Sequence, residues 1–513
     1  MYYLIHHALE RKADTIPEHE AVVHESKRFS YLEVEQKANK IANWLLEKGI
    51  KKGDRIALLL KNSINYITAY YGILKSGTVA VPLNTGLTAN EVNQLLDDCQ
   101  ARILLTEPIF SNLLHEIIAD HKLPDHLSDI AGIESFEGCS KETILVEQIF
   151  DAFSHQRPLI NIIDQDMASI IYTSGSTGKP KGVVLSHLNV VTNTKSIVSY
   201  LSLEKIDRCM VVLPFYYVYG KSLLNTHFAV GGTIIIDNRF TFPNVVLTNM
   251  IKENVTGFAG VPSTYSILLN KSAISKMTFP QLRYLTLAGG HMPLENKKRL
   301  ITLFPTKKIF IMYGATEASA RLSYLPPEEI QKRIKSIGKA IPNVELKLVL
   351  ENGDDAPNGQ EGQIVARGTN IMSHYWNNPD ETQEALINGW YQTGDLGTQD
   401  QDGFLYITGR KRDMIKVGIY KVSALEIEEV LHNHPAVFEA AVIGMLDEVL
   451  GEAPQAYVVL KEKIDKNELE NFCMSYLPPY KIPKQFVVLQ DLPKNESGKI
   501  LKSQLGNFTT SHQ

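Results

Sequence analysis

Glycine, hydroxyl and lysine residues gather in one short stretch that runs from Tyr172 to Gly182 (YTSGSTGKPKG). Three glycines, four serine or threonine residues and two lysines fall within these eleven positions. Glycine permits tight turns whose N–H groups form a concave anion site, while hydroxyls and lysines add donors and positive charge. The composition therefore indicates a loop that binds a polyphosphate, with a plain surface loop as the alternative.

This stretch differs from a Walker A loop, in which Gly-Lys is followed directly by Ser or Thr. Here Lys179 is followed by Pro180, which lacks an N–H group and does not fit a helix-opening phosphate cradle. Apolar runs at 168–171 and 183–185 flank the stretch and predict a strand on either side of it. An ordinary P-loop NTPase is therefore disfavoured.

Two other segments combine chemically active residues at the end of an apolar run. Ile309-Phe310-Ile311-Met312 leads into Tyr313-Gly314-Ala315-Thr316-Glu317, which delivers an aromatic ring, a hydroxyl and a carboxylate within five positions. Trp390-Tyr391-Gln392-Thr393-Gly394-Asp395 presents a second carboxylate. A carboxylate accepts hydrogen bonds through two oxygens and also suits a hard cation such as Mg²⁺.

The whole chain must position these segments, and its 513 residues predict two or three domains. A hydrophobic share of 44% and a charged share of 21% are typical of a globular protein, and a net charge of −5 gives no indication of a nucleic-acid-binding surface. The cysteines, Cys99, Cys139, Cys209 and Cys473, lack metal-ligand spacing and fit a reducing compartment. Neither a signal peptide nor a membrane span is predicted, so a cytoplasmic location is expected.

The first hundred residues alternate helical and strand patterns. Residues 31–46 have apolar positions at helical spacing and Gly49 ends the pattern, while residues 55–60 read as a buried strand. A helix over 66–75 and a strand over 80–83 follow, an order that predicts a parallel sheet covered by helices. Residues 120–160 are interpreted as irregular surface elaboration.

Taken together, the stretch at 172–182, the Tyr-Gly-Ala-Thr-Glu segment, the Thr393-Gly394-Asp395 segment and Leu492-Pro493-Lys494-Asn495-Glu496-Ser497-Gly498-Lys499 resemble the adenylate-forming superfamily. That superfamily includes acyl-CoA synthetases, aryl-CoA ligases, peptide-synthetase adenylation domains and luciferases. The resemblance implies an α/β fold with a large multi-subdomain N-terminal domain of mainly parallel sheets, residues 1–411. A small mobile α+β lid, residues 412–513, would follow a hinge near Arg412.

The resemblance also implies roles for individual residues. The predicted ATP- and AMP-binding residues are Thr173, Ser174, Gly175, Ser176, Thr177, Gly178, Lys179, Lys181, Gly289, Gly290, Tyr313, Gly314, Ala315, Thr316, Asp395 and Arg410. Tyr313 would stack on adenine, and Asp395 would accept the ribose hydroxyls. Glu317 would hold Mg²⁺, with Thr173 or Thr177 as a further ligand. The expected catalytic residues are Lys499, Thr316, Glu317, Lys416 and Lys421.

The acid pocket and the thiol side are expected in separate segments. Tyr216, Tyr217, Gly220, Ser263 and Gly289 would line the acid pocket, and Lys416 and Gly418 would face the thiol. Tyr217 stands where a histidine is usual, and Ile419 where relatives have a second glycine. Lys221 and Arg321 follow pocket-lining segments; solvent exposure is expected for both, with recognition of a second polar or anionic group as the alternative. No role is predicted for His291.

The implied reaction is the activation of a carboxylic acid with ATP to an acyl-adenylate, with release of pyrophosphate, followed by transfer to the thiol of coenzyme A. Transfer to the phosphopantetheine of a separate carrier protein is the alternative acceptor reaction. A non-catalytic nucleotide-binding protein and a luciferase-like oxygenation remain as further hypotheses. An amino acid is a disfavoured substrate, because the segment around Tyr216 has no aspartate to bind an α-amino group.

Overall fold

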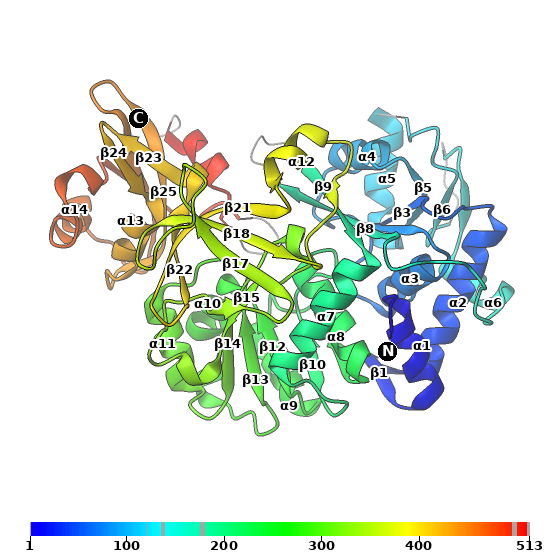
Figure 1. Cartoon of the computed structure of the whole chain (residues 1–513). Coiled ribbons are helices and arrows are strands. Elements are labelled where there is room, and N and C mark those ends of the chain that lie inside the picture. Colours follow the sequence, from blue (N-terminus) through cyan, green and yellow to red (C-terminus); the bar gives the residue numbers. More distant parts are fainter. Residues whose placement is uncertain (1, 121, 135–138, 175–179, 495–499, 510–513) are drawn as a thin grey trace.

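The computed structural model describes residues 2–120, 122–134, 139–174, 180–494 and 500–509. Within these residues the strands form four sheets, two large and two small. Figure 1 shows the large sheets with their helices in the bulk of the molecule and the C-terminal strands, in orange, at one end. The predicted fold class, a large N-terminal α/β domain followed by a small C-terminal domain, is confirmed.

The first large sheet has nine strands in the described part of the chain, and those from β14 to β1 run parallel. Its short apolar strands are buried along their whole length, as expected for a parallel sheet with helices on both faces. In spatial order the strands are β16 (Lys339–Ala340), β15 (Ser323–Leu325), β14 (Lys308–Tyr313), β13 (Tyr284–Leu287), β12 (Gly257–Gly260), β10 (Arg208–Val211), β11 (Thr233–Ile236), β1 (Glu20–His24) and β2 (Lys27–Ser30).

The second large sheet has eight strands among the described residues and carries the antiparallel β8–β9 hairpin around the predicted phosphate loop. In spatial order the strands are β19 (His374–Tyr375), β9 (Pro180–Ser186), β8 (Met167–Ser174), β4 (Val79–Pro82), β3 (Arg55–Leu58), β5 (Ala101–Leu105), β6 (Asp129–Ala131) and β7 (Glu142–Ile144). The interpretation of residues 120–160 as irregular is wrong, because β6 and β7 extend this sheet in parallel.

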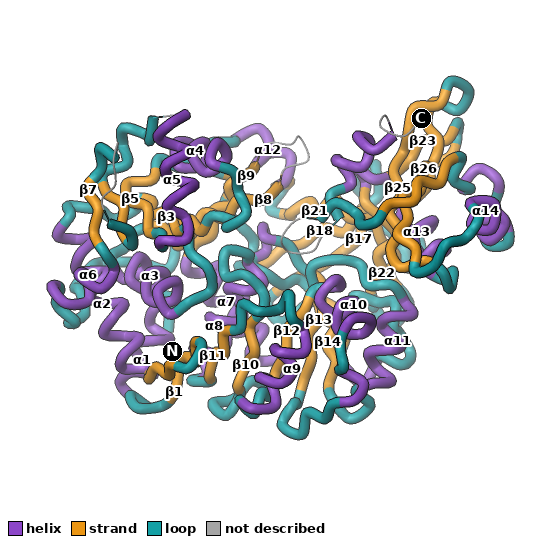
Figure 2. The backbone as a smooth tube through the Cα atoms, turned by 180° about the vertical axis from the view of Figure 1, so that it is seen from behind, coloured by secondary structure: helices purple, strands orange, loops and turns teal. Residues whose placement is uncertain are grey.

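Helices cover both large sheets, and Figure 2 shows them in purple around the orange strands. The helices of the N-terminal part are α1 (His6–Thr15), α2 (Tyr31–Glu47), α3 (Ile64–Lys75), α4 (Ala89–Asp98), α5 (Ser111–Asp120), α6 (Val146–Ala152), α7 (His187–Leu201), α8 (Val218–Val230), α9 (Pro243–Lys252), α10 (Pro262–Lys271), α11 (Leu294–Leu303) and α12 (Pro379–Ala385). The predicted helix over 31–46 is confirmed as α2. Ser30 and Glu33 form a capping box at its start, and Trp44 lies in the core.

Two small sheets complete the chain. The third sheet contains β17 (Val344–Val349), β18 (Gly362–Gly368), β21 (Trp390–Gln399), β20 (Leu386–Ile387) and β22 (Leu405–Arg410). The fourth contains β24 (Tyr420–Ser423), β23 (Met414–Val417), β26 (Gly451–Leu460), β25 (Val437–Asp447) and β27 (Gln485–Leu489), with helices α13 (Ala424–His432) and α14 (Lys466–Met474).

The fourth sheet and its helices have a hydrophobic core of their own, which includes Ile415, Ile427, Val458 and Phe486. A separate core is what an independently folding domain requires. Among the helices of the described residues, none combines the length and apolar character that crossing a bilayer needs.

Candidate active site

Lys181 of the β8–β9 hairpin and Glu317 are linked through the side chain of Tyr375. Lys181 forms an ion pair with Glu381 of α12, and its Nζ lies 5.5 Å from the centre of the Tyr375 ring. The Tyr375 hydroxyl in turn donates a hydrogen bond of 2.8 Å to Oε1 of Glu317. The predicted phosphate-side lysine and the predicted Mg²⁺ ligand therefore share one aromatic neighbour, although 136 positions separate 181 from 317 in the chain.

The Glu317 carboxylate has the chemistry to hold a hard cation. A carboxylate that accepts one hydrogen bond keeps further lone pairs, and Mg²⁺ binds through one or two carboxylates plus phosphate oxygens. The position of Glu317 is fixed by its own backbone, since its carbonyl accepts a 2.7 Å hydrogen bond from the Met372 N–H. Thr173, one of the two further ligands that were predicted, spans the hairpin with a long 3.5 Å hydrogen bond to the Lys181 carbonyl.

A second cluster joins three of the predicted nucleotide-binding residues. The Tyr313 hydroxyl donates a 2.6 Å hydrogen bond to Oδ2 of Asp395, and the Arg410 Nε lies 2.7 Å from Oδ1. Tyr313 and Asp395 are buried, and burial together with the Asp395 charge raises the pKa of Tyr313 well above its usual value. The phenol therefore stays protonated and orients the carboxylate.

Gly314 is required by the fold of the loop between these clusters. A Cβ atom on Gly314 would lie 1.9 Å from the Ala320 carbonyl oxygen, because the chain turns back after the 3₁₀ turn Thr316–Ala318. Ala320 itself has a φ of 127°, which is rare for a residue with a side chain. The close approach and the strained backbone fix where Thr316 and Arg321 lie.

The predicted acid-pocket segments also meet. A Cβ atom on Gly289, whose φ is 92°, would lie 3.1 Å from the Val261 side chain, and one on Gly290 would lie 3.5 Å from Pro262. Ser263 follows in the first turn of α10. These contacts place the glycines against the β12–α10 turn.

The aromatic part of the predicted pocket lies between β10 and α8. Tyr216 is buried, and its ring lies 4.6 Å from that of Tyr217. Gly220 lies inside α8, where a Cβ atom would be 2.1 Å from the Pro214 carbonyl oxygen. Gly220 therefore allows the helix to pack against the preceding loop.

The residues predicted for the thiol side lie in the C-terminal domain. Gly418 forms the exposed turn between β23 and β24 with a φ of 58°, and Ile419 beside it is 90% exposed. Lys421 pairs with Glu351, and the Lys416 side chain is exposed. In this conformation these residues are not brought to the Asp395 or Glu317 clusters.

Arg412 lies in a short 3₁₀ turn, Lys411–Asp413, between the last strand of the third sheet and the first strand of the fourth. Its side chain is half exposed and faces Asp413 at 3.5 Å. The connection around Arg412 is therefore a single short segment, which is the position that a hinge needs. His291, to which no role was assigned, lies 3.6 Å from Glu429 of α13, across the same boundary.

Several predicted residues lie outside the described part of the chain: Gly175, Ser176, Thr177, Gly178, Lys179 and Lys499. Ser174 ends β8, and Ala315 precedes the 3₁₀ turn that carries Thr316.

The expectation that Lys221 and Arg321 are solvent-exposed is wrong, because both are 3% exposed. Lys221 faces inward from α8 toward the ring of Tyr70, 5.2 Å away. Arg321 stacks on the ring of Tyr219, with 3.9 Å between the guanidinium carbon and the ring centre. In each case a neighbouring segment covers a side chain whose charge alone suggested exposure.

Family models match most of the chain. Residues 9–376 match the AMP-binding enzyme model, and residues 426–499 match the AMP-binding enzyme C-terminal domain. The chain belongs to the AMP-binding enzyme family. The resemblance drawn from the sequence motifs is thereby confirmed.

Curated relatives within this family are acid–CoA ligases. The chain is 32% identical over 502 residues to the long-chain-fatty-acid–CoA ligase FadD13 of Mycobacterium tuberculosis, covering 97% of each chain. It is 31% identical over 500 residues to a 2-succinylbenzoate–CoA ligase of Bacillus mycoides, again covering 97% of each chain.

Solved structures that are similar to this chain are also those of acid–CoA ligases. An anthranilate CoA ligase in complex with anthranoyl-AMP superposes with a TM-score of 0.90 at 28% identity, covering 99% of this chain and 97% of that one. The o-succinylbenzoate CoA synthetase of Bacillus subtilis with its acyl-adenylate intermediate gives 0.85 at 30% identity, covering 97% of both chains. The same enzyme has been solved with ATP and magnesium.

The comparisons identify the chain as an AMP-forming acid–thiol ligase of the acyl- and aryl-CoA type. Such an enzyme forms an acyl-adenylate and then an acyl-CoA, which favours CoA over a carrier protein as the acceptor. Its cofactors are ATP, Mg²⁺ and CoA.

Sequence reasoning missed two residues of the site, Tyr375 and Glu381. Both follow β18 in a segment without a glycine-rich or strand-end signal, and their role is visible only from the contacts with Lys181 and Glu317. No spacing pattern in a single sequence could have identified them.

Proposed function

We propose that this ligase activates a small carboxylic acid, and that Lys181, Glu317, Asp395, Arg410 and Lys499 divide the work of the first half-reaction. The observation that supports this division is the meeting of two separate polar clusters at the ends of one chain segment, Tyr313 to Glu317. One cluster, around Asp395, suits the ribose and base of a nucleotide. The other, around Glu317, suits the phosphates.

In the first half-reaction a carboxylate oxygen attacks the α-phosphorus of ATP, and the bond to pyrophosphate breaks. Two anions must meet, so the site has to neutralise charge and align the attacking oxygen. Lys181 and the Thr173 hydroxyl supply donors on the phosphate side, and Lys499 bridges the acid and the α-phosphate. Glu317 would hold Mg²⁺, which when bound would offset phosphate charge.

In the second half-reaction the acyl group passes from the adenylate to a thiol, and AMP leaves. The thiol-side residues Lys416, Gly418 and Lys421 lie away from both clusters, so this step requires the C-terminal domain, residues 412–513, to turn about Arg412. Such hinge rotation lets one chain assemble two sites in succession. CoA is the acceptor, and a phosphopantetheine carrier protein is the second candidate to test.

The test is AMP release from ATP, Mg²⁺ and CoA across short and long aliphatic, aromatic, dicarboxylic and amino acids. We expect one class to give AMP and a CoA thioester together. Adenylate without thioester would favour a carrier protein, and absence of ATP–pyrophosphate exchange with every acid would contradict the proposal.

Lys499→Ala provides the mechanistic control for this assay. We expect it to abolish adenylate formation, while a supplied acyl-adenylate is still converted to thioester. Loss of both steps in a folded variant would contradict the assignment of Lys499 to the first half-reaction.

A further inference from the structure

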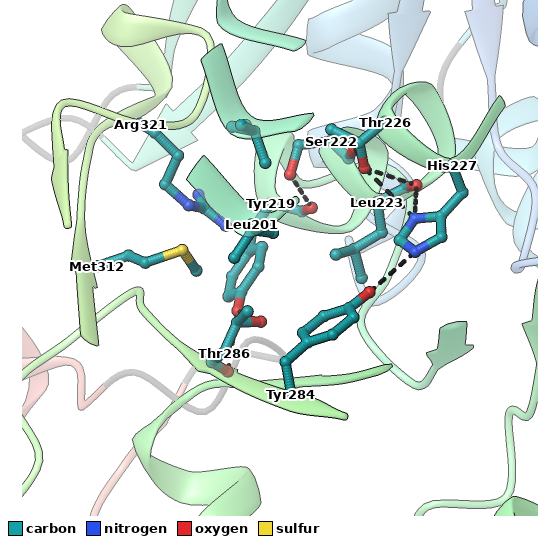
Figure 3. Close-up of a pocket in the computed structure, with 11 residues that line it drawn as sticks. Leu201, Tyr219, Ser222, Leu223, Thr226, His227, Tyr284, Thr286, Met312 and Arg321 are labelled. Atoms are coloured by element: carbon teal, nitrogen blue, oxygen red, sulfur yellow. Dashed lines mark hydrogen bonds between the residues drawn. The ribbon is translucent and has the colours of Figure 1, made fainter. Parts of the chain in front are cut away.

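A small cavity is lined by residues that lie close in sequence to the predicted acid-pocket and nucleotide segments (Figure 3). Each pocket or nucleotide segment contributes to its wall: Tyr219 precedes Gly220, Thr286 precedes Gly289, and Met312 precedes Tyr313. Helices α7 and α8 close the other side. The cavity leaves about 10 Å³ for the centre of a water molecule, which is room for one small group.

Arg321 is the charged side chain of this wall. Its Nη1 donates a 3.0 Å hydrogen bond to the Ala320 carbonyl, while its buried Nε has no hydrogen-bond partner. Among the described residues, no carboxylate lies within ion-pair distance of it. Figure 3 shows the side chain extending into the cavity above Tyr219, between Met312 and Leu201.

The backbone holds this arginine firmly. The Arg321 carbonyl accepts hydrogen bonds of 2.9 Å from both Asn193 and Asn370. The strained φ of 127° at the preceding Ala320 persists only because surrounding contacts enforce it. The guanidinium is therefore fixed in advance, which lowers the entropy lost when a ligand binds.

A buried guanidinium without an ion-pair partner is costly, and arginine cannot relieve the cost by losing its proton. Stacking on Tyr219 recovers only part of the lost hydration. Lys221 shows the contrast: burial lowers its pKa to about 7, so this side chain can discharge at neutral pH. Arg321 remains charged and lacks an anion.

We propose that Arg321 binds a second carboxylate of the acid substrate, so that this ligase acts on a short aliphatic or aryl dicarboxylic acid. The inference rests on the proposed ligase function and specifies its substrate class. Ser222, Thr226 and Thr286 supply further polar groups around the same cavity. The cavity itself has no room for a long aliphatic chain, and Tyr219 in its wall is anchored to Thr286 by a 2.8 Å hydrogen bond.

The test compares each dicarboxylic acid with its monomethyl ester, in which only the distal charge is lost. The set contains straight-chain diacids of increasing length, the three benzenedicarboxylic acids, 2-succinylbenzoate and, for comparison, long-chain fatty acids. AMP release with ATP, Mg²⁺ and CoA gives kcat/KM for each. We expect at least one diacid to exceed its ester by about 10- to 100-fold, the factor typical of a hydrogen bond to a charged group.

Variants separate recognition from packing. Arg321→Met should lower kcat/KM for the diacid by the same 10- to 100-fold and leave the ester unchanged, while Arg321→Lys should give an intermediate loss. Lys221→Met, which removes a buried basic side chain outside this cavity, should leave the diacid-to-ester ratio unaltered. If Arg321→Met fails to fold, the wild-type ratio and Arg321→Lys still decide the question.

If esters or fatty acids give the same kcat/KM as the diacids in the wild-type enzyme, the inference is overturned while the ligase function stays intact. Equal losses for diacid and ester in Arg321→Met would also overturn it and assign the arginine to packing. Absence of AMP with every acid would overturn the ligase proposal itself.

Discussion

The Tyr375 hydroxyl tests the proposed metal-binding role of Glu317, and Tyr375→Phe removes it with the smallest change in shape. The ring stays in place, so the contact with Lys181 is retained and only the 2.8 Å hydrogen bond to Glu317 is lost. A hydrogen bond to a charged group contributes about 1.5–3 kcal/mol. Water can partly replace this one, because Glu317 is only half-buried, so we take the lower end and expect about a tenfold effect.

The assay measures ATP affinity of the variant and of the wild-type protein, once with excess Mg²⁺ and once with EDTA. An outer partner that orients a metal ligand typically changes metal affinity by about 10- to 100-fold. We therefore expect the variant to bind ATP about tenfold more weakly with Mg²⁺ and equally well with EDTA. Tyr324→Phe is the matched control, because Tyr324 stacks on Tyr200 away from Glu317. An equal loss under both conditions, or no loss, would refute the assignment of Glu317.

Three further predictions concern the hinge, the loop and the pH dependence of stability. Arg412→Pro should slow thioester formation more than adenylate formation. The control Arg412→Ala should have little effect on either half-reaction. Equal slowing of both half-reactions by the proline variant, measured in separate assays, would contradict a hinge. Gly314→Ala should destabilise the fold by about 2 kcal/mol and lower Tm, since its Cβ would clash with the Ala320 carbonyl. Gly506→Ala is the control, because a Cβ atom added there would meet no atom within 4 Å. Equal Tm values for the two variants would contradict the argument. Burial lowers the pKa of His187 to about 3. The unfolded chain therefore binds a proton at His187 below about pH 6.5 that the folded chain does not, and the free energy of unfolding falls by up to about 1.4 kcal/mol per pH unit down to pH 3. The Tm of His187→Gln should fall less between pH 7 and 5 than that of the wild-type protein. An equal fall in Tm for both proteins would contradict the role given to His187.

The sequence was sufficient wherever chemistry and strand ends coincide in one local segment. Tyr313 ends an apolar strand and Glu317 follows it closely, and each lies in a polar cluster of the structure. The motif order also predicted the family, which the matches over residues 9–376 and 426–499 confirm. Local signals succeed here because strand, turn and side chain belong to one continuous stretch.

Features that depend on distant segments could not be predicted. Glu381 pairs with Lys181 across the second sheet, and no local pattern connects them. Arg321 is buried because Tyr219 of helix α8 covers it, whereas its charge alone predicts exposure. The strand β6 has only three residues, too few to show the periodicity by which a strand is recognised.

The long separation between partners in the site has a consequence for how the protein is made. The phosphate side needs Glu381 to meet Lys181, and the ribose side needs Asp395 to meet Tyr313. A nascent chain on the ribosome, which folds from its N-terminus, completes neither cluster until most of its length has emerged. Because the proposed adenylation lysine, Lys499, follows near the end of the chain, the enzyme can form a reactive acyl-adenylate only after nearly all of the domain that consumes it has been synthesised.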